Sequence, residues 1–178
     1  TRKRTLFPYT TLFRSGGPYA RDSWGYDELV QLLANRGIAV LQLNYRGSTG
    51  FGAGWLDAGF QGWGTVMHDD ITAGARWLIQ QGIADPARLC IVGWSYGGYA
   101  ALIGAVKEPD LYRCAVSIAG VSDLKAIQAE DGRFYGQDYT FRKVVVLPPG
   151  NWKASAQVMS DDWYVFRLGG QADQPCPD

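Results

Sequence analysis

Apolar and polar residues follow two periods along the chain, and these periods predict helices that alternate with strands. Apolar residues recur at helical spacing in residues 25–37 and 66–82. The second of these segments places six apolar side chains on one face: Val66, Met67, Ile71, Ala75, Leu78 and Ile79. Further helices are expected at 96–107 and 123–130, and strands rich in apolar residues at 38–47, 88–94 and 113–120.

Strands that alternate with helices indicate a parallel sheet with helices on both faces, so the predicted fold class is α/β. The glycine-rich stretch "GSTGFGAGW" (47–55) is too irregular for a helix and is expected to form a loop. Beyond residue 139 the pattern loosens, apart from short apolar runs at "KVVVL" and "WYVFRL". Residues 139–162 match no pattern that indicates a function.

Composition limits the classes of function. The chain has 178 residues, of which 47% are hydrophobic, which is enough for one domain with a sizeable core. The formal net charge is zero, so nothing indicates capture of nucleic acid. No apolar run reaches the roughly 18 residues of a membrane helix. We therefore expect a soluble protein, with the cytoplasm as the favoured compartment.

Cysteine and histidine are too sparse for a metal site. The chain has one histidine and three cysteines, Cys90, Cys114 and Cys176, without the spacing of zinc ligands or of a disulfide framework. Cys90 and Cys114 lie in apolar runs and are expected to be buried thiols. No metal and no cofactor are predicted.

The stretch "CIVGWSYGGYAAL" (90–102) carries the strongest chemical signal. It has the form strand, Gly-x-Ser-x-Gly, helix, which places Ser95 on a sharp turn as a nucleophile. Glycines at 93 and 97 leave room for the tight turn, and Gly98 lets the helix approach the sheet. A plain structural turn is the alternative interpretation.

Three motifs in order resemble one family. "GGP" (16–18), "NYRGSTGFG" (44–52) and "GWSYGGYAAL" (93–102) are similar to the catalytic domain of the prolyl oligopeptidase family, especially its dipeptidyl-peptidase and acylaminoacyl-peptidase branches. The resemblance extends to "GRFYG" (132–136). It implies an α/β-hydrolase fold, a serine peptidase that cleaves short peptides, and a β-propeller domain in the full-length protein.

The resemblance also implies roles for individual residues. Ser95 would form the acyl-enzyme, and the backbone N–H groups of Tyr96 and Gly17 would stabilise the oxyanion. A pocket for the residue before the scissile bond would be shaped by Val121, Leu124 and Ile127. Core-facing helix positions are the alternative interpretation for these three.

The start of the chain looks foreign to this domain. Residues 6–15, "LFPYTTLFRS", match codon by codon the translation of a sequencing adaptor, and Ser15 stands where the family has the histidine of His-Gly-Gly-Pro. We therefore expect residues 1–15 to be non-native and to add no central strand, leaving a truncated α/β-hydrolase peptidase domain at 16–178. A genuine strand is the alternative, since Thr, Leu, Phe and Tyr favour strands.

The base and acid of a catalytic triad are not both present. His68 precedes Ser95, whereas α/β-hydrolases order their triad Ser, Asp or Glu, His, so His68 is expected to be a partly buried structural histidine. Asp173 follows Ser95 by the family's usual spacing and is the candidate acid. The family's histidine would fall beyond Asp178, so we expect the fragment by itself to be inactive, with Asp173 about 6 to 9 Å from the Ser95 hydroxyl.

Three other functions stay open. An esterase or acyl transferase would use the same mechanism on a non-peptide substrate. A nucleotide-binding module would need the loop at 47–54 to open a helix directly, and residues 55–63 do not look like one. A non-catalytic remnant is compatible with the missing histidine.

Overall fold

The structure, a computed structural model, describes residues 7–13, 17, 19–127, 155–160 and 163–167. In these ranges the strands are β1 (Phe7–Phe13), β2 (Ala39–Leu41), β3 (Ala84–Trp94), β4 (Cys114–Ile118), β5 (Ser155–Ser160) and β6 (Trp163–Arg167). The helices are α1 (Glu28–Asn35), α2 (Ala53–Asp57), α3 (Val66–Gln80) and α4 (Tyr96–Lys107). Residues 124–127 add a further helical turn.

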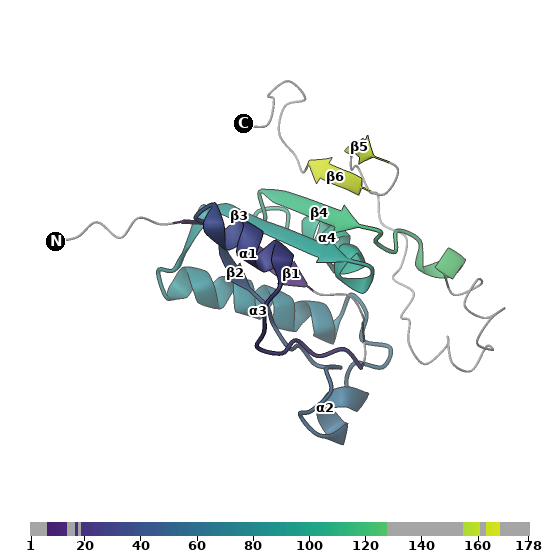
Figure 1. The fold of residues 1–178 in the computed structure, drawn as a ribbon. Helices are drawn as coiled ribbons and strands as arrows, with labels where there is room; N and C mark the ends of the chain where they lie inside the picture. The colour runs from purple at the N-terminus through teal and green to yellow at the C-terminus, as the bar shows by residue number, and fades with distance from the viewer. Residues whose placement is uncertain (1–6, 14–16, 18, 128–154, 161–162, 168–178) are drawn as a thin grey trace.

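These strands form one sheet in the order β2-β1-β3-β4-β6-β5 (Figure 1). The first four are parallel to their neighbours, whereas β6 runs antiparallel to β4 and β5 antiparallel to β6. A parallel core flanked by helices confirms the predicted α/β class. The antiparallel edge was not expected.

The two faces of the sheet differ in how well they are covered. Leu89, Ile91 and Gly93 of β3 point to one face, called here the closed face, where they are buried. This face packs against α3 and α4. Cys90, Val92 and Trp94 point to the opposite, open face, where Cys90 and Val92 are half-buried and Trp94 is exposed.

The closed face holds the core. All six apolar positions expected on one face of α3 pack there: Met67, Ile71, Ala75 and Leu78 are buried, and Val66 and Ile79 pack against them. In α4 nine of twelve residues are buried. By contrast, α1 begins at its N-cap Asp27 as an amphipathic helix but buries none of its residues.

The N-terminal strand differs from the sequence expectation. β1 pairs on both sides, with β2 through Tyr9 to Thr11 and with β3 through residues 9–13. The expectation that residues 1–15 add no central strand is therefore wrong for residues 7–13. Backbone pairing needs only an extended chain of good strand formers, and the Thr, Tyr and Phe of this segment are such residues. The adaptor origin of the segment stays a prediction.

The loop at 47–55 also differs, because it contains the short helix α2, which protrudes from the body of the molecule (Figure 1). α2 has only five residues and none of them is buried. The segment lacks the long helix, starting directly after a strand, that a dinucleotide site requires.

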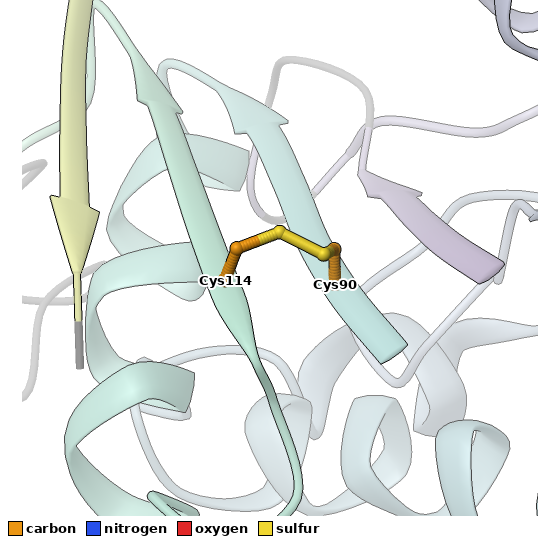
Figure 2. The surroundings of a disulfide bond; sticks show 2 residues. All are labelled: Cys90 and Cys114. Atoms are coloured by element: carbon orange, nitrogen blue, oxygen red, sulfur yellow. A yellow bond between two sulfur atoms is a disulfide. The ribbon is translucent and has the colours of Figure 1, made fainter. Parts of the chain in front are cut away.

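The cysteines are joined rather than free. Cys90 and Cys114 are opposite one another on β3 and β4 and form a disulfide bond, with their Cα atoms 4.7 Å apart (Figure 2). Both residues are half-buried. The expectation of buried thiols is therefore wrong, because adjacent strands bring together two residues that are 24 positions apart in sequence.

Candidate active site

Ser95 lies at the turn between the end of β3 and the start of α4. Its backbone has φ 55° and ψ −117°, a conformation that non-glycine residues rarely adopt. The turn is held by a hydrogen bond from the Ser95 N–H to the Ile118 carbonyl of β4, 2.9 Å long. Ser95 is half-buried and is the N-cap residue of α4, yet its hydroxyl accepts no capping hydrogen bond. The geometry is that of a nucleophile elbow.

Glycines make this turn possible, as the motif predicts. A Cβ at Gly93 would lie 2.2 Å from the Gly97 carbonyl carbon and oxygen, far inside van der Waals contact. A Cβ at Gly98 would lie 2.5 Å from the Gly120 Cα and 2.7 Å from the Ser117 hydroxyl. Strand, turn and helix are therefore in direct backbone contact, which holds Ser95 in place.

Tyr96, the first residue of α4, is buried in an aromatic cluster. Its ring centroid lies 4.6 Å from that of Trp63, 5.7 Å from that of Tyr45 and 5.9 Å from that of Tyr99. Burial, followed by the nearby Tyr45 and Tyr99, raises the pKa of Tyr96 well above its ordinary value, so its hydroxyl stays protonated. The cluster immobilises the backbone of the residue that follows Ser95.

Gly17 lies against the same cluster. It is buried, and a Cβ there would lie 3.1 Å from Cζ2 of Trp63. Two backbone hydrogen bonds support this loop, from Ala20 N–H to the Gly17 carbonyl and from Tyr19 N–H to the Gly47 carbonyl. Gly17 and Tyr96 therefore both lie against the indole ring of Trp63.

The "NYRG" stretch (44–47) connects the segment that follows Gly17 to helix α3 through side-chain hydrogen bonds and an ion pair. The Asn44 side chain exchanges two hydrogen bonds with the backbone of Asp22, at 2.8 and 3.0 Å. Arg46 makes an ion pair with Asp70 of α3 and donates to the Val66 carbonyl. The Arg46 guanidinium also donates hydrogen bonds to the Asp70 carboxylate, and these raise the pKa of Arg46. Asp70 therefore fixes this loop through Arg46.

A groove of about 780 Å³ opens beside the elbow. Its floor includes Trp94, which precedes Ser95, and Ile118, whose carbonyl accepts the Ser95 N–H. Its walls come from the segment after Gly17, from α1 and from residues 43–45, which follow β2. The groove thus reaches the two residues that flank the elbow, Trp94 and Ile118, whereas Ser95 itself is not among its lining residues.

His68 is a structural histidine, as expected, although it is more deeply buried than predicted. Its side chain is 2% exposed, and its Nε2 lies 3.4 Å from the Thr72 hydroxyl. It packs beside Gly104, nine positions along α4 from Ser95, which corresponds to about 13 Å of helix. Burial, then the charge of Lys107, lowers the pKa of His68 to about 4, against a smaller opposing effect of Asp69. His68 is not the base for Ser95.

The remaining predicted site residues are the three candidate pocket residues and Asp173. Val121 and Leu124 pack against the core as partly buried side chains, which fits their alternative interpretation, and Ile127 is half-buried. Asp173 lies outside the described residues. Because β6 is antiparallel to β4, with Ile118 opposite Trp163 and Ala115 opposite Phe166, β6 ends near the start of β4, away from the strand end that holds Ser95.

Sequence reasoning missed Trp63, which contacts both proposed oxyanion donors. The available signal was the pattern "GWG" (62–64), in which glycines flank a large aromatic residue. Within the described residues, no group of three or more His, Cys, Asp or Glu side chains could hold a metal ion. None of the described helices combines the length and the apolar character that crossing a bilayer requires.

Comparisons with known proteins point to one family. A sequence model of the prolyl oligopeptidase family matches residues 24–157. The chain is 48% identical over 112 residues to dipeptidyl aminopeptidase BIII of Pseudoxanthomonas mexicana, covering 63% of this chain and 16% of that protein. It is 43% identical over 109 residues to dipeptidyl peptidase family member 6 of Caenorhabditis elegans, covering 61% of this chain and 15% of that protein.

Solved structures that resemble this chain are also peptidases. A puromycin-hydrolyzing peptidase of Mycobacterium tuberculosis superposes with a TM-score of 0.71 at 38% identity, over 80% of this chain and 21% of that one. An acylaminoacyl peptidase bound to a chloromethyl ketone gives a TM-score of 0.71 at 25% identity, over 82% of this chain and 23% of that one. The chain thus spans less than a quarter of these relatives' length and has the α/β-hydrolase peptidase fold.

Proposed function

The chain belongs to the prolyl oligopeptidase family, and from that premise we propose that the protein is a serine peptidase that hydrolyses short peptides through an acyl-enzyme on Ser95. The observation that carries the proposal is the strained elbow, in which Ser95 has φ 55° at the end of a central parallel strand. Such strain persists only where close packing enforces it, as the contacts of Gly93 and Gly98 do here.

In the proposed reaction the Ser95 hydroxyl oxygen adds to the carbonyl carbon of the scissile peptide, and the hydroxyl proton passes to a general base. The tetrahedral oxyanion accepts hydrogen bonds from the N–H groups of Tyr96 and Gly17. Collapse releases the amine with that proton and leaves an ester on Ser95, which water then hydrolyses. The proposal assigns the base to none of the described residues, because His68 is buried between α3 and α4.

Other parts of the proposal rest on the family resemblance. Asp173 is the proposed triad acid, and Val121, Leu124 and Ile127 are the proposed walls for the residue before the scissile bond. Their half-buried positions just after β4, the strand whose end holds Ser95, support the pocket role. The greater length of the relatives supports a further domain, proposed to be a β-propeller that limits access to short peptides. A cytoplasmic location stays a prediction.

The test uses the native full-length protein with peptide nitroanilides and matched esters as substrates. We expect peptide hydrolysis that Ser95→Ala lowers by at least about a thousandfold, since loss of a triad nucleophile has effects of this order. A covalent label from a peptide chloromethyl ketone or fluorophosphonate should also disappear. Hydrolysis of esters alone would replace the peptidase with the esterase alternative, and hydrolysis unchanged by Ser95→Ala would overturn both.

A further inference from the structure

Trp63 joins the two backbone segments that supply the proposed oxyanion donors. The edge of its indole that carries Cζ2, Cε2 and Nε1 lies 3.1 to 3.3 Å from where a Cβ of Gly17 would be. The same ring meets Tyr96 edge to face, with centroids 4.6 Å apart, and Tyr99 at 5.4 Å. Trp63 is 8% exposed, so both contacts are made inside the protein.

The backbone around Trp63 is fixed from several directions. The Gly62 carbonyl accepts the N–H groups of Thr65 and Met67, and α3 starts three residues after Trp63, at Val66. The ammonium group of Lys107, at the end of α4, donates to the Gly64 carbonyl. α4 therefore contacts this turn at both of its ends, through Tyr96 at the start and Lys107 at the finish.

The indole Nε1 is buried and has no hydrogen-bond partner among the described residues. A buried donor without a partner carries a desolvation cost of about 1 to 3 kcal/mol. A phenylalanine would avoid this cost but would not extend to Gly17. The shape of the indole, rather than its hydrogen-bonding ability, is thus what this position uses.

We propose that Trp63 is a positioning residue that sets the separation of the Gly17 and Tyr96 N–H groups and so shapes the oxyanion hole. This inference rests on the proposed peptidase function. The physical reason is that these donors stabilise charge that exists only in the transition state, and their benefit depends on placement within about 0.5 Å.

The kinetic consequence differs from that of a general packing defect. A displaced donor lowers kcat while KM changes little, because the ground state is bound as before. It also weakens a peptide aldehyde inhibitor, in which the Ser95 hydroxyl adds across the aldehyde C=O and leaves its oxygen in the oxyanion hole. Loss of core packing alone lowers the free energy of unfolding but leaves the folded enzyme's kcat and aldehyde affinity intact.

The experiment compares four variants of the native full-length protein: Trp63→Phe, Trp63→Ala, Trp77→Phe and Ile71→Val. Trp77 is a tryptophan on α3 that is 49% exposed, and Ile71 is a fully buried residue of the same helix. For each variant kcat, KM, the inhibition constant of a peptide aldehyde and that of the corresponding product acid are measured, together with the unfolding midpoint.

We expect Trp63→Phe to lower kcat about tenfold with KM within about twofold, and Trp63→Ala to lower it about a hundredfold, since a displacement of roughly 1 Å has effects of this size. Aldehyde affinity should fall by the same factors, and affinity for the product acid should not. Trp77→Phe and Ile71→Val should keep native kcat, Ile71→Val with a lower unfolding midpoint.

Two results would overturn the inference: a folded Trp63→Phe enzyme with native kcat and aldehyde affinity, or one with raised KM and unchanged kcat, which would make Trp63 a substrate contact. Failure of the underlying function is distinguishable, because hydrolysis would then persist in Ser95→Ala. If Ser95→Ala is inactive while Trp63→Phe is fully active, only the positioning role is wrong.

Discussion

Neighbouring residues of β3 meet different surroundings according to the face they point to. On the closed face Leu89 and Ile91 are fully buried and Gly93 touches the backbone of α4. On the open face Cys90 is half-buried, and Trp94 is 59% exposed. The closed face is held by close packing that leaves no room for a methyl group, whereas the open face is held by a covalent bond between strands. The elbow that carries Ser95 belongs to the closed face.

The largest expected effect comes from adding a methyl group on the closed face. Gly93→Ala would place a Cβ 2.2 Å from backbone atoms of Gly97, which cannot move away as a flexible side chain can. We expect the free energy of unfolding, measured by urea denaturation, to fall by about 3 kcal/mol or more. Gly25→Ala is the matched control, because its Cβ would meet nothing within 4 Å, and it should change stability by less than about 0.5 kcal/mol. Equal stability of the two variants would show that the closed face is not tightly packed.

The next effect concerns the bond across the open face. Replacing Cys90 and Cys114 together with alanine should lower the free energy of unfolding by about 3 kcal/mol, the usual value for a bridge spanning 24 residues. A reducing agent should destabilise the native protein similarly and leave the double variant unchanged. Native stability that does not respond to reduction would mean that strand pairing alone holds this face.

The smallest expected effect is the pH dependence of stability that buried His68 causes, and it tests how well the closed face excludes water. Its pKa is about 4 in the folded chain against 6.5 in the absence of structure, so the unfolded state binds a proton first as pH falls. The contribution of His68 to the free energy of unfolding is therefore fully present above pH 6.5. It falls as the pH drops from 6.5 to 4. Between about pH 7.5 and pH 5 this loss should be about 2 kcal/mol.

The measurement is urea denaturation across this pH range, with His68→Gln as the control that should flatten the curve. Lys107 and Asp69 are the charged groups that act on His68. A native curve as flat as that of His68→Gln would show that His68 is accessible to water and that this part of the closed face is open.

Most of the parallel core and the elbow could be predicted from the sequence, whereas contacts between distant segments could not. The predicted helix at 96–107 coincides with α4, and Ser95 lies where the motif places it. β2 is much shorter than the predicted strand at 38–47, because the chain turns away at the residues that bind Asp22 and Asp70. Sequence patterns do not report such long-range hydrogen bonds.

The family resemblance from three motifs is confirmed, and the roles of Gly17, Tyr96, Asp173, Val121, Leu124 and Ile127 stay predictions. The expectation of free cysteines was wrong, because their pairing depends on the register of β3 and β4, which the sequence does not show. The apolar run at 163–168 likewise carried no information that residues 163–167 form a strand antiparallel to β4.

The sequence by itself determined the elbow, the amphipathic face of α3 and the place of the single histidine, His68, away from Ser95. Each follows from local chemistry: glycine where a Cβ would collide, apolar spacing that matches a helical turn, and a single histidine in the wrong part of the chain order. The tertiary structure alone decided that residues 7–13 pair between β2 and β3, that Cys90 bonds to Cys114, and that Trp63 lies between Gly17 and Tyr96. These outcomes depend on which segments become neighbours after the chain folds, and that depends on the packing of the whole sheet and its helices.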